Sequence, residues 1–236
     1  MTLRARADAA AQVFVDDLDR PDATEADLHH LSRVLRLREG EHVVASDGRG
    51  SWRLCRVAVG AQLAPLGEVE HEPAPAEPVR VWLPALKGER AEWAVAKLTE
   101  LGVDEIGLLA CDRAVVRPDG AVADRVLARW RRVAREAACQ SRRVRLPLID
   151  GPVGLAAAAA AGALRCDLDG IEAPQGSISL AVGPEGGWSE AERALGEPHI
   201  SLGAAVLRTE TAAVTAAVLL TTVRRAARHV TGPEAQ

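Results

Sequence analysis

The stretch LAVGPEGGWSE, residues 180–190, followed by SLGAAVLRTETAA, residues 201–213, decides how this chain is organised. Each segment joins a short apolar run to a turn, and the second turn opens an alanine-rich segment with the composition of a helix. Such apolar runs are typical of strands in an open α/β sheet, which binds ligands at its strand ends. We therefore expect the two turns to surround one small ligand with backbone N–H and C=O groups.

The composition is that of an ordinary globular protein, with 48% hydrophobic and 26% charged residues in a chain of 236. That length suffices for one large domain or two small ones. No apolar run is long enough for a membrane helix, and the first residues lack the apolar core of a signal peptide. The four cysteines are scattered, and the six histidines show no metal-binding spacing. We expect a cytoplasmic protein with no membrane contact and no bound metal.

The net charge of −4 argues against a nucleic-acid partner, but the basic residues are unevenly distributed. Residues 125–145 contain eight arginines and a single acidic residue, Glu136. A cluster of this kind is what a phosphate backbone needs, because each neutralised phosphate releases counterions. A solvated helix face explains the same cluster, and charge alone leaves both interpretations open.

The proline-rich segment HEPAPAEP, residues 71–78, divides the chain, because three prolines in eight residues favour an extended spacer. We expect a small domain over 1–72, a linker over 73–78 and a large domain over 79–236. The small domain reads as a β-barrel with strands over 13–15, 41–46 and 52–59. It also carries one helix, capped by Thr24 and running to about Leu37.

The large domain alternates strands and helices, which implies a mainly parallel sheet covered by helices. The expected strands are 79–83 and 105–110, and the expected helices are 89–101, 123–139, 153–163 and 212–228. In the first of these helices we expect Trp93, Ala94, Leu98 and Leu101 to face inward.

The loop GPEGG, residues 183–187, matches neither the dinucleotide-binding nor the P-loop glycine pattern. Its glycines allow a ligand to approach the backbone closely. Glu185 would repel a phosphate and suits a positively charged ligand. A tight strand-to-helix turn also explains the glycines, and for this loop taken alone it is the stronger explanation.

The segment LRTETA, residues 207–212, carries a less ordinary signal. Thr209 or Thr211 can cap the final helix, and Glu210 is favourable near its positive end. Arg208 opposes the helix dipole there, so its presence suggests an anionic or carbonyl partner.

In their order and spacing, several segments resemble the RsmE family of SPOUT methyltransferases. The matching segments are 29–40 and 46–50 in the small domain, and 86–103, 113–117, 129–143, 180–190 and 201–213 in the large one. Two departures stand out, because the family usually has proline where Ala204 and Ala205 stand and glycine where Arg142 stands.

The resemblance implies an α/β fold with a SPOUT-type, mainly parallel sheet and a C-terminal trefoil knot, preceded by a small PUA-like β-barrel domain. It implies a homodimer that transfers a methyl group from S-adenosyl-L-methionine to N3 of a uridine in 16S ribosomal RNA of the small ribosomal subunit, leaving S-adenosyl-L-homocysteine. A SPOUT methyltransferase with a ribose or guanine target, and a non-catalytic RNA-binding module, are the alternatives. The PUA-like front end argues against the first, and the intact loops argue against the second.

The resemblance also assigns site residues. The cofactor-binding residues are expected to be Leu180, Val182, Gly183, Pro184, Glu185, Gly186, Gly187, Leu202, Gly203, Leu207, Arg208, Thr211 and Ala212. The RNA-binding residues are expected to be Arg33, Arg36, Arg117, Arg129, Arg132, Gln140 and Arg143. For catalysis we expect Arg208 to stabilise negative charge on the uracil oxygens. Glu210 is either a base or a helix-end acid, and we favour the second role.

Overall fold

The computed structural model describes residues 3–172, 178–195 and 198–230. The chain divides into two compact units. The first consists of Met1–Pro75 together with Arg135–Leu146, and the second of Ala76–Ala134 together with Pro147–Gln236. The sequence-based division, with limits at 72 and 79, assigns no such second segment to the small domain.

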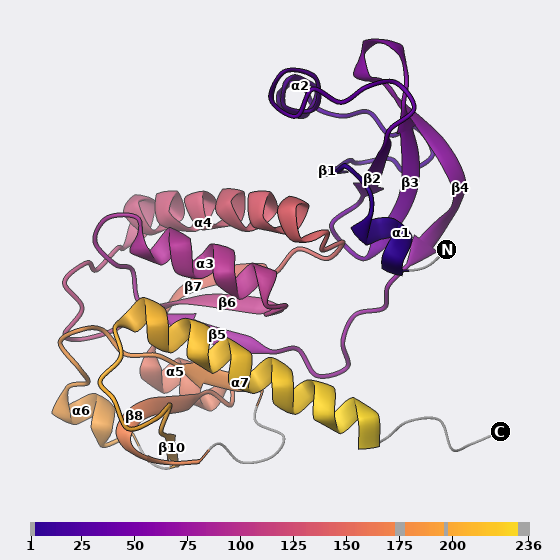
Figure 1. The fold of residues 1–236 in the computed structure, drawn as a ribbon. Helices are drawn as coiled ribbons and strands as arrows, with labels where there is room; N and C mark the ends of the chain where they lie inside the picture. The colour runs from indigo at the N-terminus through magenta and orange to yellow at the C-terminus, as the bar shows by residue number, and fades with distance from the viewer. Residues whose placement is uncertain (1–2, 173–177, 196–197, 231–236) are drawn as a thin grey trace. The chain divides into compact units, whose positions relative to one another are not determined.

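The first unit is built on one four-stranded sheet (Figure 1). Its elements are α1 (Leu3–Ala7), β1 (Ala11–Phe14), α2 (Glu25–His29), the π-helical turn η1 (His30–Val34), β2 (His42–Ser46), β3 (Ser51–Val57), the 3-10 turn η2 (Val59–Ala61) and β4 (Leu63–His71). The strand order is β1-β2-β3-β4, with β1 parallel to β2 and the other pairs antiparallel. The sequence predicts a small β-barrel in this unit. Within the described residues, the strands of this unit form the one four-stranded sheet.

The helix of the first unit begins as expected but ends early. Thr24 is its N-cap and accepts a hydrogen bond from the Asp27 N–H at 3.1 Å. The regular helix α2 ends at His29, and the chain leaves η1 after Val34, short of the expected end at Leu37. Arg36 has a φ of 54°, which no helix residue adopts.

Strand β4 was not expected from the sequence. Pro65 and Gly67 lie inside it, and both residues are poor strand formers that hide an alternating pattern. Most of its side chains are exposed, so its place in the sheet rests on backbone pairing with β3 rather than on burial.

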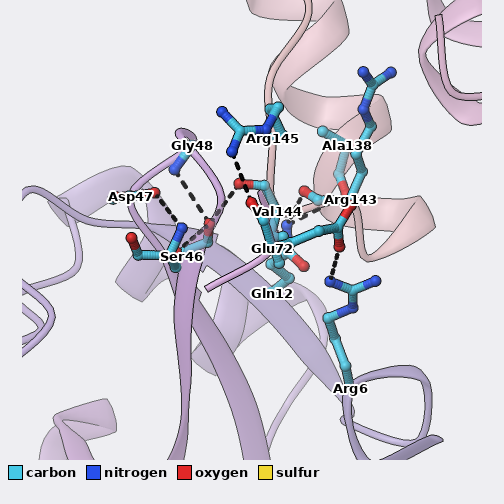
Figure 2. A network of polar contacts seen from close by, with 11 residues as sticks. Arg6, Gln12, Ser46, Asp47, Gly48, Glu72, Ala138, Arg143, Val144 and Arg145 are labelled. Carbon is cyan, nitrogen blue, oxygen red and sulfur yellow. Dashed lines mark hydrogen bonds and ion pairs between the residues drawn. The ribbon is translucent and has the colours of Figure 1, made fainter. Parts of the chain in front are cut away.

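The segment 135–146 belongs to the first unit because its backbone is bound there by buried polar side chains (Figure 2). The Gln12 amide on β1 donates to the Arg143 carbonyl at 2.7 Å. The Ser46 hydroxyl, at the end of β2, donates to the Val144 carbonyl at 2.9 Å. Buried carbonyls need such partners, so the small sheet and this segment form one cooperative structure.

The second unit is a six-stranded sheet with helices on both faces (Figure 1). Its elements are β5 (Arg80–Leu83), α3 (Arg90–Glu100), β6 (Glu105–Ala110), α4 (Gly120–Ser141, whose last residues belong to the first unit), β7 (Leu148–Gly154), α5 (Leu155–Ala160), β8 (Leu164–Ile171), β9 (Ser179–Ala181), α6 (Glu190–Arg193), β10 (His199–Ile200) and α7 (Thr209–Val230). The strand order is β10-β8-β9-β5-β6-β7, and each of these pairs is parallel, as the sequence predicts.

Alternate residues of the central strand β5 serve two different cores. Val81 and Leu83 pack with buried side chains of α3, α4 and α7. Trp82, between them, packs with Leu155 and Ala158 of α5 on the opposite face. Because successive strand residues point to opposite faces, a parallel sheet covered on both sides must be apolar throughout.

Three expectations for the second unit need correction. Trp93 does not face inward: it is 49% exposed, because the buried stripe of α3 runs through residues 91, 94, 95 and 98 and leaves position 93 outside it. The expected helix 153–163 is shorter, since Val153 lies in β7 and α5 ends at Ala160. Strands β7 and β8 were missed, because glycine and exposed residues interrupt their apolar pattern.

The remaining helices α3, α4 and α7 and the strands β5 and β6 lie where the sequence predicts them. No helix in the described part of the chain combines the length and apolar character needed to cross a bilayer. The C-terminal trefoil knot stays a prediction.

Candidate functional site

A cavity of about 220 Å³ lies in the second unit, beside β8, the loop after β9 and the segment that leads into α7. The sequence-predicted residues that line it are Val182, Gly183, Pro184, Glu185, Gly187, Leu202, Gly203 and Leu207. The cavity therefore forms at the end of β9, a central strand of a parallel sheet, where open α/β sheets bind their ligands.

The two turns singled out in the sequence are joined directly. Thr209, the first residue of α7, is buried, and its hydroxyl donates to the carbonyl of Gly183 at 3.0 Å. Residues of both turns line the same cavity. A single hydrogen bond between a helix start and a glycine loop thus fixes the two walls of the cavity against each other.

The other predicted cofactor residues do not line the cavity. Leu180 and Ala212 are buried in the core, whereas Arg208 and Thr211 are exposed. Gly186 packs against the backbone of the loop after β6. Of the two threonines considered as helix caps, Thr209 is the one that connects the turns. A direct role of these five residues in cofactor binding stays a prediction.

The indole of Trp188 explains why the loop needs glycine at position 183. A Cβ on Gly183 would lie 2.8 Å from the indole ring, closer than side chains approach. Trp188 is 3% exposed, and its Nε1 donates to the Cys166 carbonyl on β8 at 2.8 Å. The indole therefore packs against the loop and connects it to β8.

A second set of contacts holds the loop after β6 beside the cavity. Ser189 and Glu192 form a capping box at the start of α6. The buried Glu192 carboxylate also accepts the Asp112 N–H at 3.0 Å, and the Ser189 hydroxyl donates to the Asp112 carboxylate at 2.6 Å. The segment that carries Arg113 and Arg117 is thereby held against the turn that follows the glycine loop 183–187.

The charges beside the cavity centre on Glu185. Its carboxylate is ion-paired with Arg90, the first residue of α3. The hydrogen bond from Arg90 is the main cause that lowers the pKa of Glu185, and the charges of Arg90, Arg208 and Lys87 lower it further. The guanidinium of Arg90 also lies 3.7 Å from a carboxylate oxygen of Glu210. Three cations, Arg90, Arg208 and Lys87, therefore act on this one carboxylate.

Sequence reasoning missed Arg90, although a signal was present. An arginine in the first turn of a helix opposes the helix dipole, and that argument already singled out Arg208. Applied to the segment LKGER, residues 86–90, it would have marked Arg90 as a residue with an anionic partner.

Sequence reasoning also missed a second acid, Asp167 on β8, which lines the cavity. Its carboxylate lies 3.7 Å from the guanidinium of Arg193 and 3.8 Å from that of Arg165. Because β8 was not predicted as a strand, nothing in the sequence pattern placed this side chain near the glycine loop.

Cys166 is the cysteine that lines the cavity, but its thiol is not a nucleophile. Burial raises its pKa to about 12, with a further contribution from the charge of Asp167. Only the thiolate is a reactive nucleophile, so this side chain is an apolar part of the wall at neutral pH. Across the described residues, no three His, Cys, Asp or Glu side chains are grouped so as to hold a metal ion.

The predicted RNA-binding residues fall into both units. In the first unit, Arg33, Arg36 and Gln140 are exposed, and Arg143 is half-buried. In the second unit, Arg117 and Arg132 are exposed, whereas Arg129 is ion-paired with Glu92 at 2.9 Å. The exposed arginines retain the solvent access that contact with a phosphate requires.

Two protein families match parts of this chain. The RNA methyltransferase domain family matches residues 72–221, and the RNA methyltransferase PUA domain family matches residues 23–61. A parallel α/β sheet with a cavity at its strand ends and a PUA domain before it thus defines the chain as an RNA methyltransferase, an enzyme.

Individual relatives narrow the class. The chain is 37% identical over 210 residues to the ribosomal RNA small subunit methyltransferase E of Mycobacterium tuberculosis, covering 79% of this chain and 80% of that protein. It is 35% identical over 214 residues to the protein of that name from Synechocystis sp., covering 80% and 68%. The chain belongs to the ribosomal RNA small subunit methyltransferase E family, RsmE, which confirms the resemblance seen in the sequence.

Solved structures agree. The ribosomal RNA small subunit methyltransferase E of Neisseria gonorrhoeae, bound to S-adenosyl methionine, superposes with a TM-score of 0.71 at 26% identity, covering 90% of this chain and 97% of that one. A putative methyltransferase of Legionella pneumophila, in complex with the same cofactor, superposes with a TM-score of 0.74 at 25% identity, covering 91% and 97%.

Proposed function

We propose that this protein transfers the methyl group of S-adenosylmethionine to N3 of a uridine in 16S ribosomal RNA. The observation that carries the proposal is the cavity between the two turns tied together by Thr209 and Gly183, in a chain of the RsmE family. The neighbouring structures that hold S-adenosylmethionine support the choice of cofactor.

The lining of the cavity fits this cofactor. Gly187 and Gly203 have φ values of 68° and 130°, a region that favours glycine. Because glycine has no side chain, a ligand can approach the backbone closely at these two positions. Leu202 and Leu207 supply apolar surface, and Glu185 supplies negative charge. When bound, S-adenosylmethionine supplies a methyl group on a positively charged sulfur, and a cavity with an acidic side chain and no phosphate-binding pattern suits that charge.

In this proposal Arg208 assists the nucleophile. Uridine N3 carries a weakly acidic proton that must leave before or during attack on the methyl group. Arg208 directly precedes α7 and is exposed beside the cavity wall formed by Leu207. Its guanidinium stabilises the negative charge that grows on the uracil carbonyl oxygens, which eases loss of the proton.

Glu210 serves as a helix-end acid in this proposal rather than as the base. It lies in the first turn of α7, where a carboxylate is favoured by the helix dipole. It is 9% exposed, and Arg90 lies 3.7 Å from its carboxylate. An acid engaged inside the protein in this way is poorly placed to reach a uracil.

The test of the catalytic role is Arg208→Ala, with cofactor binding and turnover measured separately. We expect turnover at saturating S-adenosylmethionine to fall by about 100-fold, the usual effect of removing one such donor, whatever the change in cofactor affinity. Arg208→Lys keeps the charge and is the matched control, with partial recovery expected. Near-normal turnover of Arg208→Ala would rule the role out.

The RNA substrate contacts both units in this proposal. Arg33, Arg36, Gln140 and Arg143 would bind it in the first unit, and Arg117, Arg129 and Arg132 in the second. The substrate is 16S ribosomal RNA, free or in the small subunit, so the protein works in the cytoplasm.

We also propose that the chain acts as a homodimer. Several apolar side chains of the second unit are uncovered, among them Val206 at 82% exposed, Val115 at 68% and Trp93 at 49%. Exposed apolar side chains that gather in one contiguous patch mark a surface that another protein covers. Light scattering should give twice the chain mass of 24.9 kDa, and a monomeric mass at micromolar concentration would contradict the proposal.

A further inference from the structure

The side chain of Glu185 takes part in two kinds of contact. Glu185 lines the cavity proposed for the cofactor. It is also ion-paired with Arg90, which reaches it from the start of α3. One acid therefore serves both the cavity and a fixed positive charge of the protein.

The other acid at the cavity is engaged differently. Asp167 is enclosed by Arg165 and Arg193, and its side chain is 16% exposed. The side chain of Glu185 is 47% exposed, and that of Arg90 is 33% exposed. Glu185 is thus the lining acid that remains open to a ligand, and Arg90 is the protein cation in direct contact with it.

The charge of the cofactor changes during the reaction. When the methyl group leaves, the C–S electron pair stays on sulfur, and the methyl carbon bonds to N3 of uridine, whose proton passes to solvent. The sulfur therefore falls from a charge of +1 to zero. A positive donor competes with Arg90 for Glu185, whereas a neutral thioether product does not.

We propose that Arg90 is a counter-ion that competes with the cofactor's sulfonium for Glu185, and that this competition sets the relative affinity of the site for donor and product. The inference rests on the proposed function. Arg90 weakens the binding of the donor, and its ion pair with Glu185 regains full strength as the sulfur loses its charge. Arg90 is a positioning residue that acts through Glu185. It favours the methyl-transfer step rather than strong binding of the donor.

The test compares the two ligands by calorimetry on the full-length protein. In Arg90→Gln the ratio of the Kd for S-adenosylhomocysteine to the Kd for S-adenosylmethionine should rise about 3-fold, because an exposed ion pair that solvent screens changes an affinity by a small factor only. In Glu185→Gln the same ratio should fall about 3-fold. Turnover of Arg90→Gln should fall while its KM for the donor also falls.

Three variants serve as controls. Arg90→Lys keeps the charge and should keep the ratio of the wild type. Lys97→Gln and Glu100→Gln alter an ion pair of the same helix α3 whose residues do not line the cavity, and they should leave the ratio unchanged. Thermal unfolding of each variant shows whether it is folded under the conditions of the titration.

The proposal is overturned if Arg90→Gln weakens both ligands equally, because that result assigns Arg90 a structural role only. It is also overturned if the ratio responds to Lys97→Gln and Glu100→Gln instead. Both results leave the proposed function intact. A wild-type protein that binds neither ligand would overturn the proposed function itself.

Discussion

The cavity proposed for the cofactor and the arginines of α4 are built in opposite ways. The cavity depends on backbone positions and on buried groups such as Trp188 and Thr209, which touch several segments at once. The arginines of α4 are side chains on the outside of one helix, and several of them, such as Arg132, are exposed. One region is made by packing and the other by charge.

This difference determines how each region responds to substitution. A close-packed loop has no room for added atoms, so a single methyl group disturbs it. A charged surface acts through the sum of many weak, screened interactions, so each arginine has a graded effect that depends on salt. The predictions below test that distinction, from the largest expected effect to the smallest.

The strongest test of the packed region is Gly183→Ala. The added Cβ would overlap the Trp188 indole, so the loop must shift at a cost of about 1–3 kcal/mol, the range for overpacked sites. We expect S-adenosylmethionine affinity, measured by calorimetry, to fall by 10-fold or more. At Gly154 nothing lies within 4 Å of an added Cβ, so Gly154→Ala is the control. Equal behaviour of the two variants would show that the loop is not limited by packing.

A second test removes the link between the cofactor loop and the loop after β6. Glu192→Ala leaves the Asp112 N–H without its acceptor and abolishes the capping box, which should lower the free energy of unfolding by about 1–3 kcal/mol. Glu190→Ala, at an exposed position of the same helix, should change it by less than about 0.5 kcal/mol. Urea denaturation measures both. Similar losses would mean that the link contributes nothing specific.

The charged region is tested by the double variant Arg33→Gln, Arg132→Gln, with one change in each unit. We expect the RNA affinity to fall about 10-fold at low salt, and the slope of log affinity against log salt to decrease by about 2. Arg56→Gln alters an exposed arginine of β3 outside the predicted set. An unchanged slope in the double variant, or an equal change in Arg56→Gln, would show that the predicted RNA-binding arginines are only a solvated surface.

The smallest effect near neutral pH concerns the thiols, because their contribution changes only above pH 9. Burial raises the pKa of Cys111 and Cys166 to about 12 and that of Cys55 and Cys139 to about 11, from an ordinary value of 9.0. Folded thiols thus hold protons that unfolded ones release above pH 9. The stabilising contribution is complete below pH 9 and is lost as the pH rises through 11 to 12.

Urea titrations between pH 8 and pH 10.5 should therefore show a falling free energy of unfolding. Thiol labelling at pH 8 should require unfolding, because the folded thiols are neutral and largely buried. Rapid labelling of Cys166 in the folded protein would contradict the packed description of the cavity wall.

Periodicity predicted the long helices and two of the strands of the second unit. Strands β5 and β6 and helices α3, α4 and α7 follow from apolar spacing, because each buries a wide face in the core. Prediction failed where burial does not follow a simple period. Strand β4 is mostly exposed, and Trp93 lies just outside the buried stripe of its helix.

The candidate site divides in the same manner. The glycine loop and the start of α7 could be recognised from the sequence, because the residues that favour a turn or a helix start are adjacent in the chain. Arg90 and Asp167 come from elements distant in sequence, and only the strand order brings them to Glu185 and the cavity wall.

The sequence by itself determined the class of fold, the two turns and the family, because these depend on local composition and on motifs in a fixed order. The tertiary structure decided which groups face one another: Thr209 with Gly183, Arg90 with Glu185, and segment 135–146 with the small sheet. Such contacts join residues far apart in the chain, and their partners are set by strand order and packing. No local pattern encodes that choice.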